Sequence, residues 1–197
     1  MTVNYGTPVY APGITNYQVD DGESAYYTWS SSIFGSPTFP NPDSGTWRLT
    51  GGATDNLASE DNVFQVYSLI PRIGSQANIG QMFELDIDSR TGPATLTWKG
   101  KVSFLGLSGG WQYFNIWNET THLWNLLFTL SPINTEHIVE LTALQVANAM
   151  ITGKVYFACT FINYTVNQTS TLSTDYINLA MAFEIKYGTP TYGTPAY

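Results

Sequence analysis

Cysteine and basic residues are scarce in this chain. Cys159 is the only cysteine, so no intrachain disulfide can form, and its place in an apolar run predicts a buried, unreactive thiol. Seven Lys plus Arg against fifteen Asp plus Glu give a net charge of −8. Because binding to phosphates needs clustered cations, we expect no direct nucleic-acid partner. Two histidines and one cysteine leave few ligands for a transition metal, and we expect no metal and no cofactor.

Long hydrophobic runs are absent as well. No stretch of about 18 apolar residues occurs, and the residues after Met1 form neither a basic nor an apolar leader. From this pattern we expect no signal peptide, no membrane insertion, and a protein made in the cytoplasm.

Charged residues make up only 11% of the chain, where soluble domains have ~25%. The 43% of hydrophobic and 15% of aromatic residues are enough for a large core, and 197 residues suit one domain that buries roughly 70% of its unfolded surface. Uncharged polar side chains must then cover most of the surface. Such a surface has little electrostatic repulsion, which favours packing against copies of the same chain.

Apolar and polar residues alternate with period two over much of the chain, which is typical of strands with one buried face. The pattern predicts strands over 17–29, 46–50, 63–70, 81–88, 94–105, 111–117, 123–130, 154–166 and 175–186. The stretch 134–150 is ambiguous: its helix formers and a candidate cap at Asn134 or Thr135 predict a short helix, whereas 137–147 also fits a strand. We therefore predict an all-β fold, an antiparallel β-sandwich with at most one short helix near 134–150.

The two ends of the chain carry a nearly matching motif, Tyr-Gly-Thr-Pro-x-Tyr. Proline fixes φ and pushes the preceding residue to extended conformations, so both ends are predicted to be extended. We predict an N-terminal arm over 1–16, a β-sandwich domain over 17–186 and a C-terminal arm over 187–197. The arms are either tails without a role or segments that order on a neighbouring subunit. The residues expected to make those contacts are Tyr5, Pro8, Tyr10, Tyr187, Pro190, Tyr192 and Pro195.

Three carboxylates, Glu84, Asp86 and Asp88, occupy alternate positions of one predicted strand and therefore share a face. Neighbouring carboxylates can raise each other's pKa, as a general acid requires. The segment resembles the E-[IL]-D-x-E signature of laminarinase-like glycosidases, which implies Glu84 as nucleophile, Asp86 as helper and Asp88 in place of the acid/base glutamate. The alternative is the solvated face of an outer strand with Arg90 as counter-charge. We predict no catalytic residue and keep this site as an alternative.

Aromatic residues crowd the segment around residue 114. Trp111, Tyr113 and Trp117 should share one face of a strand. Exposed, they would form a platform for sugar rings; buried, they would belong to the core or to a subunit contact, which the pattern favours because the opposite face is apolar too.

Three sequons, at Asn118, Asn163 and Asn167, fit N-glycosylation acceptors and would mark surface loops if they are used.

In length, composition, strand number and terminal arms, the chain resembles a jelly-roll capsid protein of an icosahedral virus of a thermophilic archaeon. The resemblance implies a single jelly roll of about eight strands and a structural virion protein without enzymatic activity. It implies a location in the virion, and as partners copies of the same chain in a large assembly and other virion proteins. The alternatives are a laminarinase-like hydrolase, a carbohydrate-binding β-sandwich, or a surface filament subunit that donates a strand, with a cell-surface or extracellular location.

Overall fold

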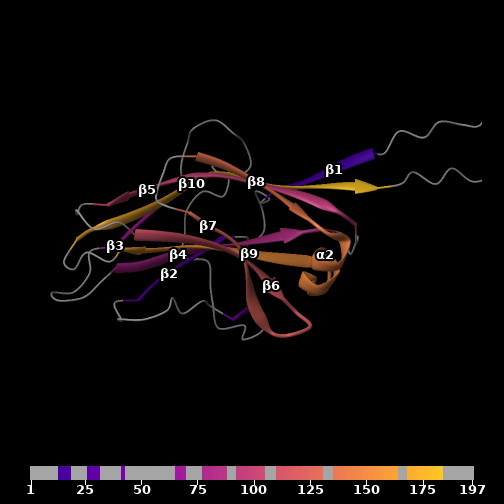
Figure 1. Ribbon diagram of the computed structural model, residues 1–197, viewed down its shortest axis with the longest axis horizontal. Helices are drawn as coiled ribbons and strands as arrows, with labels where there is room; N and C mark the ends of the chain where they lie inside the picture. The colour runs from indigo at the N-terminus through magenta and orange to yellow at the C-terminus, as the bar shows by residue number, and fades with distance from the viewer. Residues whose placement is uncertain are drawn as a thin grey trace, which may run out of the picture.

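The alternating segments fold into antiparallel strands that form two stacked sheets, as the computed structural model in Figure 1 shows. The structure describes residues 13–18, 26–31, 41–42, 65–69, 77–87, 92–104, 110–130, 135–163 and 168–183. Its strands are β1 (Gly13–Gln18), β2 (Tyr26–Ser31), β3 (Gln65–Leu69), β4 (Ala77–Asp86), β5 (Ala94–Phe104), β6 (Gly110–Asn118), β7 (Leu123–Leu130), β8 (Thr135–Leu141), β9 (Lys154–Asn163) and β10 (Ser170–Phe183). The helix α2 (Ala143–Ala149) lies between β8 and β9.

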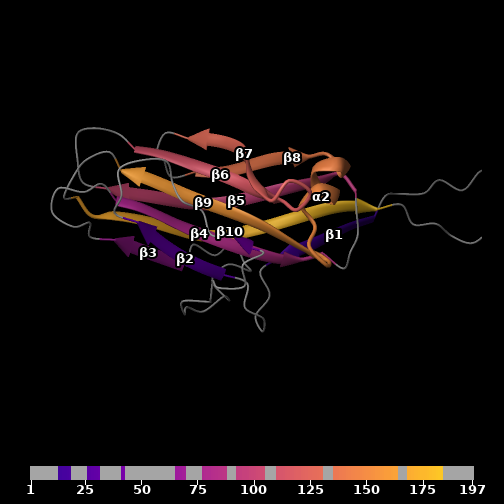
Figure 2. The same cartoon turned by 90° about the horizontal axis from the view of Figure 1, so that it is seen from below.

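The first sheet has the strand order β1–β10–β5–β8, and the second sheet has the order β2–β4–β9–β6–β7. Strand β3 also joins the first sheet: it pairs with the beginning of β10, whereas β1 pairs with its end. Figures 1 and 2 show the two sheets as layers of one sandwich, with strands that are distant in sequence lying side by side. The antiparallel β-sandwich of jelly-roll type that the sequence predicts is therefore confirmed.

The core lies between the inner faces of the two sheets. Trp98 of β5 is fully buried and packs on Phe114 of β6, with ring centroids 5.7 Å apart, so two large core side chains join the layers. Gly100 makes room for this indole, because a Cβ atom at Gly100 would collide with the Trp98 ring and with the backbone of β10. Cys159 lies in the same core.

A short polar chain crosses the core between the sheets. The Trp98 indole nitrogen donates to the Thr174 hydroxyl at 3.1 Å, and that hydroxyl donates to Gln81 Oε1 at 2.6 Å. The Gln81 amide nitrogen in turn donates to the Leu172 carbonyl at 3.4 Å. Since a buried polar group without a partner costs ~1–3 kcal/mol, this chain fixes how β4 faces β10.

Strands β7 and β8 close the same side of the sandwich. His137 of β8 packs between Phe128 of β7, at 5.3 Å, and Trp98, at 6.1 Å between ring centroids. Each of the two strands ends its sheet: within the described part of the chain, β7 pairs only with β6 and β8 only with β5. The edge of one sheet thus lies beside the edge of the other.

The ambiguous stretch 134–150 contains both a strand and a helix. Strand β8 runs to Leu141, and α2 follows at once. The helix cap is Thr142, and the prediction of a cap at Asn134 or Thr135 is wrong, because Thr135 already pairs with Gly100 in the sheet. Thr142 and Gln145 form a capping box, in which the Thr142 hydroxyl accepts from the Gln145 backbone amide and the Gln145 side chain accepts from the Thr142 amide.

Other boundaries differ from the prediction. The described residues form ten strands rather than about eight. The predicted strand 17–29 is two strands in different sheets, and β1 begins at Gly13, inside the segment that we expected to be an arm. The predicted strand 46–50 lies outside the described residues.

Among the residues that the structure describes, no helix is both long enough and apolar enough to span a membrane.

Candidate functional site

The carboxylates of β4 lie on the outer face of the second sheet. Glu84 stands opposite Tyr156, and Asp86 opposite Lys154, on the neighbouring strand β9. The Lys154 ammonium donates to Glu84 Oε1 in a close, partly buried ion pair. The proposed nucleophile of a glycosidase is therefore held in an ion pair with a strand residue, while Asp88 and Arg90 lie outside the described residues.

Sequence reasoning missed Lys154 as the counter-charge of Glu84. The two residues are 70 positions apart, and only the register of β4 against β9 brings them together. Opposite charges on neighbouring antiparallel strands were the signal that could have found the pair.

The aromatic residues of β6 share one face, as predicted. Phe114 and Ile116 pack into the core, so Trp111, Tyr113 and Trp117 lie on the outer face of the second sheet. They differ in burial, however. Trp117 is buried, Tyr113 is partly exposed, and Trp111 is 47% exposed. The predicted interface row therefore divides into a closed part at Trp117 and an open part at Trp111 and Tyr113.

The closed part is a small hydrophobic cluster. Trp117 packs edge-on against Trp124 of β7, with ring centroids 5.4 Å apart, and contacts Met82 and Tyr156 in the same cluster. These side chains come from four neighbouring strands of the second sheet. Their role is to hold the outer face of that sheet together, so Trp117 is a structural residue.

The open part lies toward the β7 edge. Tyr113 stands opposite Thr129 of β7, and Thr129 is exposed. The surface thus combines two accessible aromatic rings with a hydroxyl. Two polar atoms on the same face, Asn115 Nδ2 and Thr160 Oγ1, are buried and make no hydrogen bond within the described part of the chain. Such atoms are usually paired by an ordered water or by a ligand.

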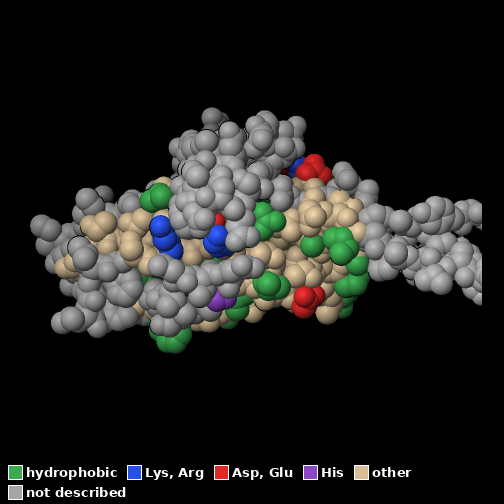
Figure 3. Space-filling model, turned by 90° about the horizontal axis from the view of Figure 1, so that it is seen from above, with side chains coloured by type: hydrophobic (Ala, Val, Ile, Leu, Met, Phe, Trp, Pro, Cys, Tyr) green, Lys and Arg blue, Asp and Glu red, His purple; other side chains and the backbone are tan. Residues whose placement is uncertain are grey.

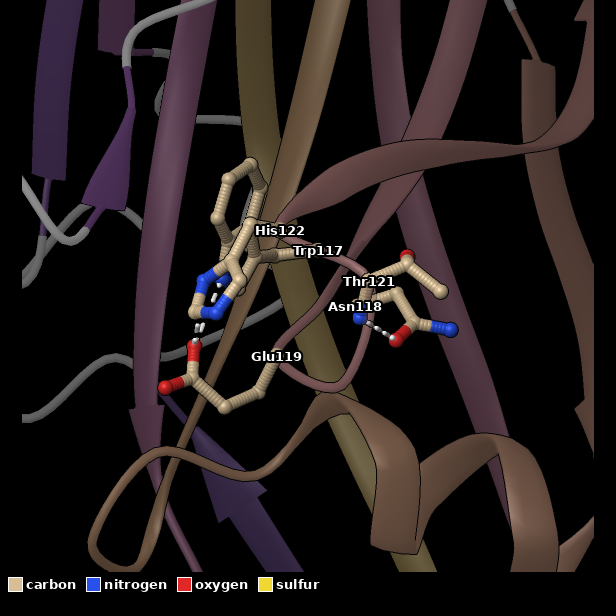
Figure 4. Close-up of polar contacts among 5 residues, drawn as sticks. All are labelled: Trp117, Asn118, Glu119, Thr121 and His122. Atoms are coloured by element: carbon tan, nitrogen blue, oxygen red, sulfur yellow. Dashed lines mark hydrogen bonds and ion pairs between the residues drawn. The ribbon is translucent and has the colours of Figure 1, made fainter.

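The β6–β7 turn forms a compact polar cluster next to the closed part (Figure 4). The Trp117 indole nitrogen donates to Glu119 Oε2 at 3.1 Å, and His122 Nδ1 lies 4.0 Å from the same oxygen. The Thr121 amide donates to Asn118 Oδ1 at 3.0 Å. His122 has φ of 54°, in the left-handed region, which closes the turn.

The Glu119 amide ties this turn to the helix end, because it donates to the Asn148 carbonyl at 2.7 Å. The cluster therefore positions the hairpin against α2. It holds one carboxylate and one imidazole, and we assign it a structural role.

The outer face of the first sheet is seen in Figure 3, where basic side chains gather near its middle. Lys99 and Lys101 alternate on β5, and Lys99 Nζ lies 3.1 Å from Asp175 Oδ2. Asp175 is fully buried at a bulge of β10, and among the described residues neither of its carboxylate oxygens accepts a hydrogen bond. The ion pair with Lys99 thus compensates for the burial of this charge.

The sequons occupy different environments. Asn118 lies at the partly exposed start of the β6–β7 turn. Asn163 ends β9, is fully buried, and donates from Nδ2 to the Ser170 hydroxyl at 3.0 Å. Asn163 therefore does not lie in a surface loop, because β9 continues through it. Asn167 lies outside the described residues.

The thiol of Cys159 is buried, as predicted, and it accepts a hydrogen bond from Gln112 Nε2 at 3.0 Å. Burial raises its pKa to about 12, so the thiolate that a nucleophile needs does not form near neutral pH. Within the described residues no group of three His, Cys, Asp or Glu side chains is placed to hold a metal ion. The candidate arm residues Tyr5, Pro8, Tyr10, Tyr187, Pro190, Tyr192 and Pro195 all lie outside the described part of the chain.

No protein-family model matches the sequence, and no curated protein matches it. Among solved structures, the chain is similar to a family 11 carbohydrate-binding module from Clostridium thermocellum in complex with a β-1,3-1,4-mixed-linked tetrasaccharide. The identity is 10%, the match covers 83% of this chain and 94% of that one, and the TM-score is 0.32.

Two larger proteins also match in part. The xylanase 10B of Clostridium thermocellum, a CBM22-1–GH10 structure with xylohexaose, is 10% identical, with 92% of this chain and 30% of that chain covered and a TM-score of 0.38. A Ruminococcus gnavus GH29 fucosidase is 9% identical, with 66% and 22% covered and a TM-score of 0.37. The chain spans about a fifth of the fucosidase. Likenesses this weak carry no argument about function.

Proposed function

We propose that this chain is a non-catalytic carbohydrate-binding β-sandwich that uses the open part of its aromatic row. The observation that carries the proposal is the pair Trp111 and Tyr113 on the outer face of β6, with Trp111 47% exposed. Alternate residues of a strand stand ~7 Å apart. Two rings at this spacing offer a flat apolar surface to the C–H face of sugar rings, while the sugar hydroxyls stay hydrated or pair with polar side chains.

Polar groups for such a ligand lie beside the rings. The exposed Thr129 hydroxyl faces Tyr113 across the β6–β7 pair. Asn115 and Thr160 on the same face are buried and lie beneath the surface that such a ligand would contact. A surface with accessible aromatics and few charges suits a neutral polyhydroxyl ligand better than an ionic one. An extracellular or cell-surface location, given above as an alternative, agrees with this role.

The experiment is titration calorimetry of the full chain with a panel of neutral oligosaccharides. The panel consists of a mixed-linked β-1,3-1,4-glucan tetrasaccharide, β-1,4-galactotriose, mannohexaose and xylohexaose. We expect at least one to bind, and Trp111→Ala to weaken that binding about tenfold or more, because an aromatic stacking surface is lost. Leu144→Ala, an exposed apolar residue on α2, is the matched control and should bind as the parent chain does. Absence of binding across the panel, or equal binding by Trp111→Ala, would contradict the proposal.

The glycosidase alternative is tested with the same purified chain. The ion pair between Glu84 and Lys154 favours a structural role for Glu84. We therefore expect no release of reducing sugar from a β-glucan. Hydrolysis that disappears in Glu84→Gln would replace the binding proposal with the enzymatic alternative.

A structural subunit of a large assembly, such as a viral shell, is the second candidate. The observation that favours it is a set of exposed apolar side chains on strands at the edges of the two sheets: Ile14, Val66, Leu123, Leu126 and Ile138. Large apolar side chains on sheet edges suit burial against another subunit. Negative-stain microscopy of the full chain should then show regular particles, and a monomer at high concentration would exclude this candidate.

A further inference from the structure

The bulge in β10 places a carboxylate directly beside a lysine of the neighbouring strand. Between Thr174 and Tyr176 the register of β10 against β5 shifts, so Asp175 is the extra residue beside Lys99. Lys99 Nζ lies 3.1 Å from Asp175 Oδ2. The Asp175 side chain is fully buried, while the Lys99 side chain keeps 22% of its surface exposed. A nitrogen atom and a carboxyl group are thus held within contact distance in the first sheet.

This pair differs from an ordinary ion pair in the surroundings of its carboxylate. Among the described residues, neither oxygen of Asp175 accepts a hydrogen bond, although the Lys99 ammonium is in contact. Buried ion pairs are normally held by hydrogen bonds to the remaining lone pairs. The ion pair of Lys154 with Glu84 shows the contrast: its ammonium donates a hydrogen bond to the carboxylate, and both side chains reach solvent. As a charge, the Asp175 carboxylate is therefore less well compensated than that of Glu84.

We propose that Lys99 and Asp175 condense into an amide bond that joins β5 to β10. Transfer of one proton within the pair turns the ammonium and the carboxylate into an amine and a carboxylic acid. The lone pair of Lys99 Nζ then attacks Asp175 Cγ, so that a new N–C bond forms and the C–O bond to the hydroxyl breaks. The hydroxyl leaves with a proton from the nitrogen as one water molecule. The reaction therefore needs no oxidant, no reductant and no other co-reactant.

Proximity and burial favour this condensation. Reacting atoms held ~3–3.5 Å apart are in near-attack geometry, and the fold has already met the entropy loss of bringing them together. The amide carries no charge, so its formation removes the buried charge of Asp175 along with that of Lys99. Because the Asp175 side chain is fully buried, water has little access to the new bond, which opposes its hydrolysis.

The amide lies at a gap in the pairing of β10. On the side of β10 away from β5, strand β3 pairs up to Thr174 and strand β1 pairs from Asn178 onward. Within the described residues, the stretch between them has only β5 as a neighbouring strand. A covalent link from Asp175 to Lys99 therefore fixes β10 to the sheet where strand pairing supports it on one side alone. This bond does not depend on carbohydrate binding.

Intact mass spectrometry of the full, denatured chain tests the bond. The parent chain should be about 18 Da lighter than its sequence mass, because one water has left. Proteolysis should then release one fragment in which the peptides of Lys99 and Asp175 stay joined. A parent chain at its full sequence mass overturns the proposal, whatever the variants do.

Two lysine variants identify the source of the lost water. Lys99→Arg should have its full sequence mass, because the guanidinium keeps the positive charge beside Asp175 but remains protonated and does not attack the carboxyl carbon. Lys154→Arg is the matched control: it changes the lysine of the ion pair with Glu84 and should keep the loss of one water. An aspartate that cyclises onto its own backbone also loses water but needs no lysine. A loss that persists in Lys99→Arg, or that disappears in both variants, therefore overturns the proposal.

Discussion

Strands β7 and β8 close the same side of the sandwich, yet their edges carry different residues. β8 has Glu136 and Glu140 on either side of the exposed Ile138, and Glu140 accepts a hydrogen bond from Thr95 at 3.1 Å. β7 has exposed leucines and no charge. Charges on an edge strand oppose pairing with another chain. A protein with few charges thus protects one edge and leaves the other suited to contact.

Phe128→Ala tests the packing contact between β7 and β8, and we expect it to change stability more than the other substitutions below. Phe128 stacks on Phe114, with ring centroids 5.1 Å apart, and packs at a tilt against His137, at 5.3 Å, so its loss opens the core on this side. We expect a loss of about 2 to 3 kcal/mol, because the side chain is only partly buried. Urea unfolding measures it, and exposed Leu144→Ala should change stability by less than about 0.5 kcal/mol. Equal losses in both variants would contradict a packed β7–β8 contact.

The substitution Glu140→Leu tests whether charge alone keeps the edge of β8 from pairing with another chain. The added leucine joins Ile138 to form an apolar edge. We expect self-association about tenfold stronger than in the parent chain, measured by sedimentation equilibrium. Glu140→Gln should give a smaller increase because the side chain stays polar. A chain that remains monomeric would show that β8 is protected by its shape instead.

Thr142→Ala weakens the helix that begins directly after β8. The Thr142 hydroxyl and Gln145 satisfy each other's backbone amides in the capping box. Its loss should cost about 1 kcal/mol of stability. The substitution Thr142→Ser, which keeps the hydroxyl, should cost much less. If both variants unfold alike, the cap does not determine where β8 ends.

The smallest expected effect is the pH dependence of stability that comes from His137 on β8. Burial lowers the pKa of His137 from 6.5, so the folded chain binds a proton at lower pH than the unfolded chain does. Stability should therefore fall as pH drops below about 6.5, until His137 is protonated in the fold as well. His137→Gln should remove this part of the slope in urea unfolding between pH 7 and 5. His122→Gln, in the exposed turn, should keep it.

Local sequence pattern predicted much of the fold. Strand β7 matches its predicted range of 123–130, and the ends of β5 and β6 lie within one residue of theirs, because period-two alternation reflects one buried face. Strand β4 overlaps the predicted range of 81–88 but begins four residues earlier, at Ala77. The apolar run around Cys159 likewise indicated a buried thiol. The predicted ends of the elements were wrong where the residue pattern fitted both a helix and a strand. At 134–150, for example, a helix follows a strand without a loop.

Sequence alone determined the fold class, the strand faces and the shared face of Trp111, Tyr113 and Trp117. Tertiary structure decided which of these aromatics stay open, since that depends on what packs against the outer face of the second sheet. It also decided the ion pairs of Glu84 with Lys154 and of Asp175 with Lys99. These contacts join strands distant in sequence, and their register comes from side-chain packing across two sheets, which no local pattern contains. The bulge that shapes the β7 edge appears only in that register.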